Sequence, residues 1–111
     1  MKFSTKETSG VMVIKMEGSM LGGPEASELN NTLHKLIEGK KKKVVVDLSE
    51  VTLMNSSGLG MLIGGVTTMR NAGGDLKIAC ATDKVAQVFK ITKVSNVVEL
   101  HDDVNAAVKS F

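Results

Sequence analysis

Two short stretches with a strand-like pattern open the chain, Lys2 to Thr8 and Val11 to Glu17. Ser9 and Gly10 stand between them, and a pair of small residues is typical of the tight connection in a β-hairpin. The pattern therefore predicts a sheet that begins with two antiparallel strands.

A helical pattern follows the break at Gly22-Gly23-Pro24. Proline suits the first position of a helix, and the apolar residues after it recur at helical spacing until Gly39. Next, Val44 to Leu48 forms the continuous apolar run expected of a parallel strand that is buried on both faces. The apolar positions of the helix are Ala26, Leu29, Leu33, Leu36 and Ile37.

The alternation of strand and helix then repeats to the end of the chain. Two further strands are predicted, Asp75 to Ala81 and Val97 to Leu100. The whole pattern predicts an α/β fold: a mixed sheet of about five strands, with about four helices packed against it and right-handed crossovers. The second helix ends near Gly73-Gly74, the third is capped by Thr82 or Asp83, and the last is opened by Asp102 or Asp103.

Length and composition are those of one compact unit. With 111 residues and 42% hydrophobic content, a single domain over residues 1–111 is expected. No apolar run approaches the roughly eighteen residues of a membrane-spanning helix, and Met1 to Lys6 lacks the apolar stretch of a secretory signal. We therefore expect a cytoplasmic protein without membrane insertion. The single cysteine, Cys80, is expected to be a small buried side chain without a redox role.

Charge and aromatic content disfavour direct binding to nucleic acid. The formal net charge is +2, and only three aromatic residues are present to stack on bases. The run Lys40 to Lys43 lies between a helix end and a strand, where solvated lysines also favour the helix C-terminus. We interpret this run as a solvated loop.

The residues needed for catalysis or for a cofactor are missing from the pattern. A serine hydrolase needs G-x-S-x-G with a histidine and a carboxylate, whereas Ser56 lies in N-S-S-G and the only histidines are His34 and His101. Gly58 to Gly64 is only superficially like a dinucleotide fingerprint, because its last glycine comes one place late. No Cys/His cluster or phosphate-binding P-loop motif is present. We expect a protein that is not an enzyme and has no cofactor.

Two serines, Ser56 and Ser57, open the second apolar helix. A serine oxygen can accept a hydrogen bond from an unpaired amide there, and the free N–H groups and the helix dipole also accept an anion such as phosphate. The serines are therefore either caps or a phosphorylation switch. Gly58 and Gly60 would allow a partner or kinase to approach closely, or allow the helix to pack tightly on the sheet.

The carboxyl ends of neighbouring parallel strands meet at one edge of a sheet, which places Ser49 to Gly58 near Ala81 to Asp83. Met20 and Leu21 would join this edge as an exposed apolar patch for a protein partner, or they would both tuck under the first helix. Of these two, we favour the interpretation that Met20 and Leu21 contact a protein partner. The candidate partner-binding residues are Met20, Leu21, Asn55, Ser56, Ser57, Gly58 and Thr82.

The segment Asp47 to Gly60, D-L-S-E-V-T-L-M-N-S-S-G-L-G, resembles the signature of the STAS domain family, most closely the bacterial anti-sigma factor antagonists. The order of elements, the length and the later G-G-D-L-K-I-A strand also look like this family. The family's regulatory phosphoserine is the first serine of D-S-S-G-L-G or D-S-A-G-L-G, which corresponds to Ser56, and Ser57 would bond to the first-turn backbone. Two departures remove negative charge: Asn55 replaces the usual Asp, and the turn Gly18 to Gly23 lacks its acid.

The resemblance implies an interaction switch. The unphosphorylated protein would bind an anti-sigma factor, expected to be a serine kinase as well, and so release a sigma factor for transcription. Phosphorylation of Ser56 would end this binding, and a phosphatase would restore it. The alternative is an accessory STAS module of a transporter or lipid-trafficking complex, in which Ser56 is only a cap.

Overall fold

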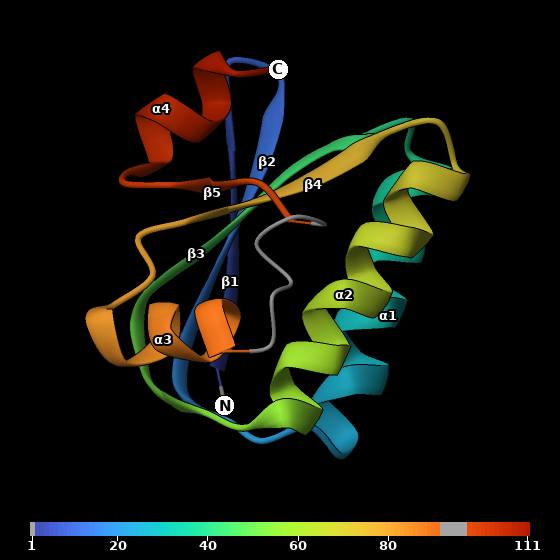
Figure 1. Cartoon of the computed structure of the whole chain (residues 1–111). Helices are drawn as coiled ribbons and strands as arrows, with labels where there is room; N and C mark the ends of the chain where they lie inside the picture. The colour runs from blue at the N-terminus through green and yellow to red at the C-terminus, as the bar shows by residue number, and fades with distance from the viewer. Residues whose placement is uncertain (1, 92–97) are drawn as a thin grey trace.

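The computed structural model describes residues 2–91 and 98–111, which form a five-stranded sheet covered by helices (Figure 1). The strands lie in sequence order, β1 antiparallel to β2 and every later neighbour parallel. This confirms the predicted α/β fold and the predicted hairpin. The elements are β1 (Lys2–Thr8), β2 (Val11–Met20), α1 (Pro24–Glu38), β3 (Lys43–Met54), α2 (Ser56–Asn71), β4 (Asp75–Ala79), α3 (Asp83–Ile91), β5 (Leu100–His101) and α4 (Val104–Lys109).

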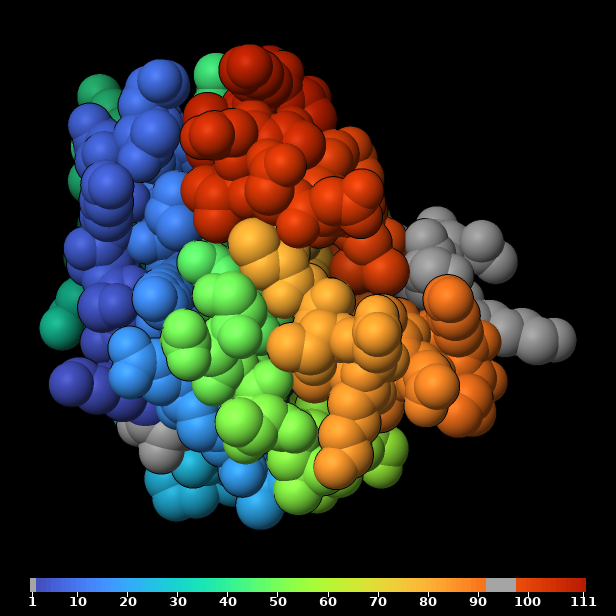
Figure 2. Space-filling model, turned by 90° about the vertical axis from the view of Figure 1, so that its left-hand side faces the viewer, coloured from blue at the N-terminus to red at the C-terminus, as the bar shows by residue number. Residues whose placement is uncertain are grey.

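The helices divide unequally between the two faces of the sheet. Helices α1, α2 and α3 cover one face, where Val44, Val46 and Leu48 of β3 enter the main core. The intervening Val45 points to the other face, where α4 packs through Ala107 over a smaller cluster. Figure 2 shows that second side, with β1 and β2 in blue beside α4 in red. Because α4 is short, much of this face is left to solvent.

Strand β3 is longer than the predicted run from Val44 to Leu48. It continues to Met54, because β2 stays paired with it as far as Met20 opposite Met54, through two shifts of register. The segment expected to be a loop from Ser49 onward is therefore mostly strand. Strand β4 ends earlier than predicted, at Ala79. The predicted strand from Val97 overlaps the observed β5 only at Leu100, and Val97 itself lies outside the described residues.

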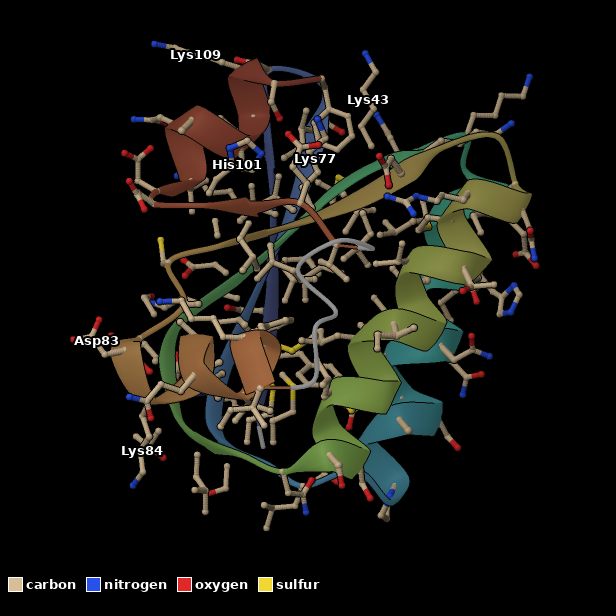
Figure 3. The ribbon with its side chains drawn as sticks, in the orientation of Figure 1. Lys43, Lys77, Asp83, Lys84, His101 and Lys109 are labelled. Atoms are coloured by element: carbon tan, nitrogen blue, oxygen red, sulfur yellow. The ribbon has the colours of Figure 1, made fainter. Side chains whose placement is uncertain are left out.

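A buried lysine fastens the last residues to the sheet (Figure 3). Lys77 of β4 is only 6% exposed, and its Nζ donates to the Ser110 carbonyl oxygen at 2.9 Å and to Ser110 Oγ at 2.7 Å. The same ammonium lies 3.3 Å from Glu99 Oε2 and 4.5 Å from the centre of the Phe111 ring. Desolvation raises the pKa of Glu99. The hydrogen bonds and charges of His101 and Lys77 lower this pKa by more than desolvation raises it, so the pKa lies below its usual value.

Candidate functional site

Helix α2 begins with an asparagine cap. Asn55 has an extended backbone, its Oδ1 accepts the N–H of Gly58 at 2.9 Å, and its carbonyl oxygen accepts the N–H of Leu59 at 3.0 Å. Ser56 is the first residue inside the helix. Of the two roles left open for the serines, that of helix cap is therefore excluded: the amide side chain one residue earlier reaches the free N–H instead.

Both serines of the first turn are exposed. Neither hydroxyl makes a hydrogen bond to the part of the chain that the structure describes. For Ser57, this contradicts the expected bond to the first-turn backbone, and its Cβ faces Gly22 instead. For Ser56, the hydroxyl is accessible to a modifying enzyme and is not needed to hold the helix in place.

The first turn of α2 is packed directly onto the end of β2. A Cβ built on Gly58 would fall against the carbonyl oxygen of Met20, deep inside van der Waals contact. The Met20 oxygen also accepts the N–H of Asn55 at 3.3 Å. Gly58 is thus a packing residue, one of the two roles that its sequence context allowed, and its burial removes it from the contact surface. Gly60, where an added Cβ would meet open space, faces outward.

Met20 and Leu21 were predicted to share one environment, but the structure places them in opposite ones. Met20 is 0% exposed and belongs to the main core, so its prediction as a partner contact is wrong. Leu21, one residue further on, is 47% exposed. Leu53 is 42% exposed and lies just before Met54, the strand partner of Met20. The two exposed leucines therefore flank one cross-strand pair at the edge that carries Ser56.

Leu53 was missed by the sequence analysis. It lies between buried Val51 and buried Met54, at a spacing of three rather than two. The register shift near Ser19, its partner in β2, breaks the alternation that would have indicated its exposure.

Thr82 caps the neighbouring helix. Its Oγ1 accepts the N–H of Val85 at 3.4 Å, and its carbonyl oxygen accepts the N–H of Ala86 at 2.7 Å, so the hydroxyl is engaged within α3. Cys80, two residues before it, is half-buried rather than fully buried and has a left-handed φ of 61°. Burial, followed by the charge of Asp47, raises the pKa of its thiol, so the thiol is protonated near neutral pH.

The loops and first helical turns at this edge, residues 20–25, 49–59 and 80–84, carry mainly negative charge. Glu25, Glu50 and Asp83 are opposed by a single base, Lys84. Figure 3 shows Asp83 and Lys84 at the start of α3, at the end of the molecule opposite Lys43 and Lys109. A phosphate on Ser56 would meet helix N–H groups but no cluster of basic side chains within these loops.

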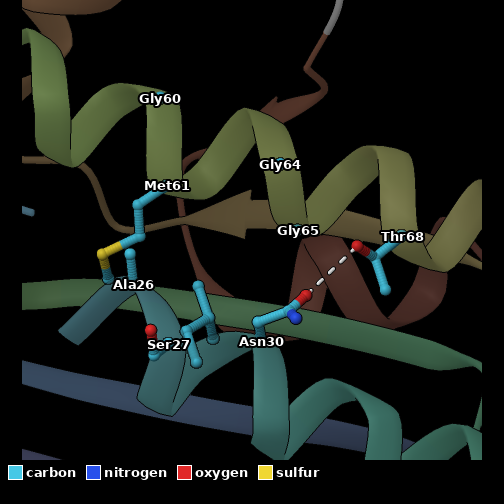
Figure 4. A pocket seen from close by; sticks show the side chains of 9 residues that line it. Ala26, Ser27, Asn30, Gly60, Met61, Gly64, Gly65 and Thr68 are labelled. Atoms are coloured by element: carbon cyan, nitrogen blue, oxygen red, sulfur yellow. Dashed lines mark hydrogen bonds between the residues drawn. The ribbon is translucent and has the colours of Figure 1, made fainter. Parts of the chain in front are cut away.

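A groove of about 470 Å³ runs between α1 and α2, starting next to the serine turn (Figure 4). Small side chains line much of it, including Ser27 and the exposed Gly60 and Gly64. Thr68 Oγ1 donates to Asn30 Oδ1 at 3.4 Å across the groove. Within residues 2–91 and 98–111, no group of three acidic, histidine or cysteine side chains is arranged to hold a metal ion, and no helix is long and apolar enough to span a bilayer.

The STAS domain family matches residues 2–107 of the chain. An anti-sigma-B factor antagonist of Listeria monocytogenes is 33% identical over 55 residues, 50% of this chain and 48% of the relative, so the match spans about half of that relative's length.

Solved structures of other proteins share the fold. An anti-sigma factor antagonist from Mycobacterium paratuberculosis has a TM-score of 0.82 at 17% identity, over 98% of this chain and 92% of the other. SpoIIAA of Bacillus in its phosphorylated form has a TM-score of 0.72 at 14% identity, over 98% of each chain. A sulfate transporter family protein from Wolinella succinogenes has a TM-score of 0.79 at 16% identity, over 93% and 85%. These identities establish a common fold and no more.

Proposed function

Because the chain belongs to the STAS domain family, we propose that residues 1–111 form a single STAS domain that acts as an anti-sigma factor antagonist. Its unphosphorylated form binds an anti-sigma factor that is also a serine kinase, and thereby frees a sigma factor for transcription. Phosphorylation of Ser56 ends the binding, and a phosphatase restores it. The name of the Listeria relative supports the role, and the phosphorylated form of SpoIIAA supports the switch.

The observation that carries the proposal is the environment of Ser56. Its hydroxyl is exposed, has no hydrogen bond to the described residues, and stands on the first residue of α2, whose cap is supplied separately by Asn55. A phosphate would add about −1.5 to −2 charges where helix N–H groups and the helix dipole favour an anion. The modified domain therefore stays folded, and the effect of the phosphate is confined to the surface.

We define the serine surface as Leu21, Leu53, Asn55, Ser56 and Ser57. The two half-exposed leucines are the apolar anchors of the proposed interface, and a charge-poor apolar centre is typical of protein contacts. A dianionic phosphate on Ser56, at the same edge, must be desolvated when a partner docks, and this costs free energy unless the partner supplies cations. Thr82 remains a proposed contact at the margin, through its backbone or methyl group. Met20 and Gly58 are buried and contribute indirectly, by fixing the position of helix α2 on the end of β2.

Asn55 gives this surface a neutral cap where the family usually has an acid. Its amide oxygen performs the capping, as the 2.9 Å bond to Gly58 shows. We infer that the cognate kinase recognises a serine whose preceding residue is uncharged, which sets its charge preference apart from kinases that meet an aspartate there.

The test uses the proposed partner, an anti-sigma factor with serine kinase activity. Incubation with the kinase and labelled ATP should place one phosphate on the wild type and on Ser57→Ala, and none on Ser56→Ala. Labelling that survives in Ser56→Ala and disappears in Ser57→Ala would reject Ser56 as the site. A melt of all three proteins controls for folding, and the midpoints should agree because neither hydroxyl bonds to the described residues.

The accessory-module alternative has one specific support, the shared fold with a sulfate transporter family protein. In that role the partner would be a transporter subunit, and Ser56 would be an unmodified residue of the first helical turn. Intact-mass analysis of the protein from its native cell, followed by fragmentation to locate any phosphate, separates the two: a phosphate at Ser56 supports the switch, whereas an unmodified mass under all growth conditions supports the module.

A further inference from the structure

A second hollow lies on the other face of the sheet, away from the serine surface. Helix α4 packs over β3, β4 and β5 and shares a buried cluster with Val11 and Val13 of β2, but it leaves the β1 side of this face uncovered. Where the blue strands meet red α4 in Figure 2, a pocket of about 410 Å³ is lined by strand residues on one side and by Val104 and Asn105 on the other. This volume lies in the range of sites for small molecules.

The strand register gathers polar groups of opposite charge in this pocket. Lys15 of β2 is paired with Ser4 of β1 on one side and with Asp47 of β3 on the other. Lys6 is paired with Val13, the next inward-facing position of β2. The row therefore presents a hydroxyl, an ammonium and a carboxylate, with a second ammonium one position along.

The two lysines of the pocket are uncommitted. Neither Lys6 nor Lys15 has an ion pair or hydrogen bond with the residues that the structure describes, although Lys15 is half-buried. Asp47 accepts the N–H of Ser49 at 2.9 Å, which uses part of a carboxylate's capacity of about four lone-pair sites. A ligand of this pocket would therefore need groups that accept hydrogen bonds from the two ammonium groups and a group that donates to the carboxylate.

We propose that this pocket between β1, β2 and the flank of α4 binds a small phosphorylated polyol. The dianionic phosphate lies between the ammonium groups of Lys6 and Lys15, where charge-assisted hydrogen bonds are strong. A bare anion would be repelled by Asp47, whereas a hydroxyl on the same molecule donates to that carboxylate. Ser4 and Asn105 provide further hydrogen bonds, and the carbon chain rests on apolar Val13 and Val104.

The pocket is separate from the proposed switch. It is built on the first half of β2, around Val13 and Lys15, whereas the serine surface lies beyond the opposite end of that strand at Met20. A failure of the ligand proposal would therefore leave the switch untouched, and the reverse also holds.

The experiment is a titration of the full chain with glycerol 3-phosphate, followed by amide chemical shifts in NMR. We expect saturable changes at Val13, Lys15 and Val104, no such changes with glycerol, and weaker binding of inorganic phosphate. Lys15→Gln should bind roughly tenfold more weakly, because a charge-assisted hydrogen bond is lost. The matched control is Lys84→Gln, which removes the same charge from the exposed start of α3 and should bind like the wild type.

Three results would overturn the proposal. These are the absence of saturable shifts with glycerol 3-phosphate, equal weakening in Lys15→Gln and Lys84→Gln, and shifts centred outside the pocket. A third variant tests the role of the polyol: Asp47→Asn should reduce the preference for glycerol 3-phosphate over inorganic phosphate. An unchanged preference in Asp47→Asn would remove the carboxylate from the recognition and refute the assignment of the polyol.

Discussion

Replacing Met20 with alanine removes a side chain that is completely buried in the main core. Met20 lies at the end of β2, beneath the first turn of α2, and its Cγ is among the atoms closest to Gly58. Loss of a buried methionine costs roughly 2–5 kcal/mol of unfolding free energy, depending on how far the neighbours relax. For a domain of this size, that corresponds to a fall of about 10 °C or more in the thermal midpoint.

Leu21→Ala is the matched control, because it truncates the adjacent residue on the surface. Leu21 is 47% exposed, so its truncation should cost less than about 1 kcal/mol in stability. If Leu21 is an interface anchor, the same change should weaken binding to the anti-sigma factor by more than about 1 kcal/mol. Met20→Ala should bind with nearly wild-type affinity once the folded fraction is accounted for.

The assay is a urea melt followed by circular dichroism, since the chain has no Trp or Tyr for fluorescence, combined with calorimetric titration against the partner. The reasoning is refuted if Met20→Ala melts within error of the wild type, or if Leu21→Ala is the more destabilised of the two. A Leu21→Ala protein that is stable and binds normally would remove this residue from the serine surface.

Three further predictions concern the helix start and the C-terminal edge. Gly58→Ala should lower the thermal midpoint, because its Cβ meets the Met20 carbonyl oxygen, whereas Gly60→Ala should be neutral or stabilise by up to about 1 kcal/mol; equal midpoints would contradict the packing. Asn55→Ala should cost about 1 kcal/mol in a urea melt while Asn55→Asp keeps the cap, and an unchanged Asn55→Ala would exclude it as the cap. The pKa of Glu99 is lowered, so its contribution is complete above the unfolded value of about 4.3 and is lost as the pH falls through the folded value. The stability difference between wild type and Glu99→Gln should therefore shrink on acidification, and a difference that is constant with pH would refute the ion pairing.

The elements with clear periodicity were predictable from the sequence, because local pattern and tertiary packing agree in them. Helix α1 begins at Pro24 and ends at the cap Gly39 as its pattern indicated. The second half of β3 was not predictable, since its burial depends on pairing with β2 through a shifted register. No residue in Ser49 to Met54 carries that information by itself.

The candidate site was likewise predictable from the sequence only in part. The sequence placed Ser56 at the start of α2, but the choice between Asn55 and a serine as the cap depends on backbone angles at the strand end. The burial of Met20 and the exposure of Leu21 depend on where the contact between Gly58 and Met20 fixes helix α2. This contact joins residues far apart in the sequence, so no local pattern indicates it.

The affinity of the anti-sigma factor for the unphosphorylated and the Ser56-phosphorylated protein tests the central claim most directly. Both forms are prepared, their phosphate content is checked by intact mass, and each is titrated calorimetrically at the same ionic strength. We predict that phosphorylation weakens binding by at least tenfold, about 1.4 kcal/mol, while the thermal midpoint stays within a few degrees because the helix N-terminus accepts the charge. Equal affinities for the two forms, or a phosphorylated protein that unfolds, would contradict a surface switch at Ser56.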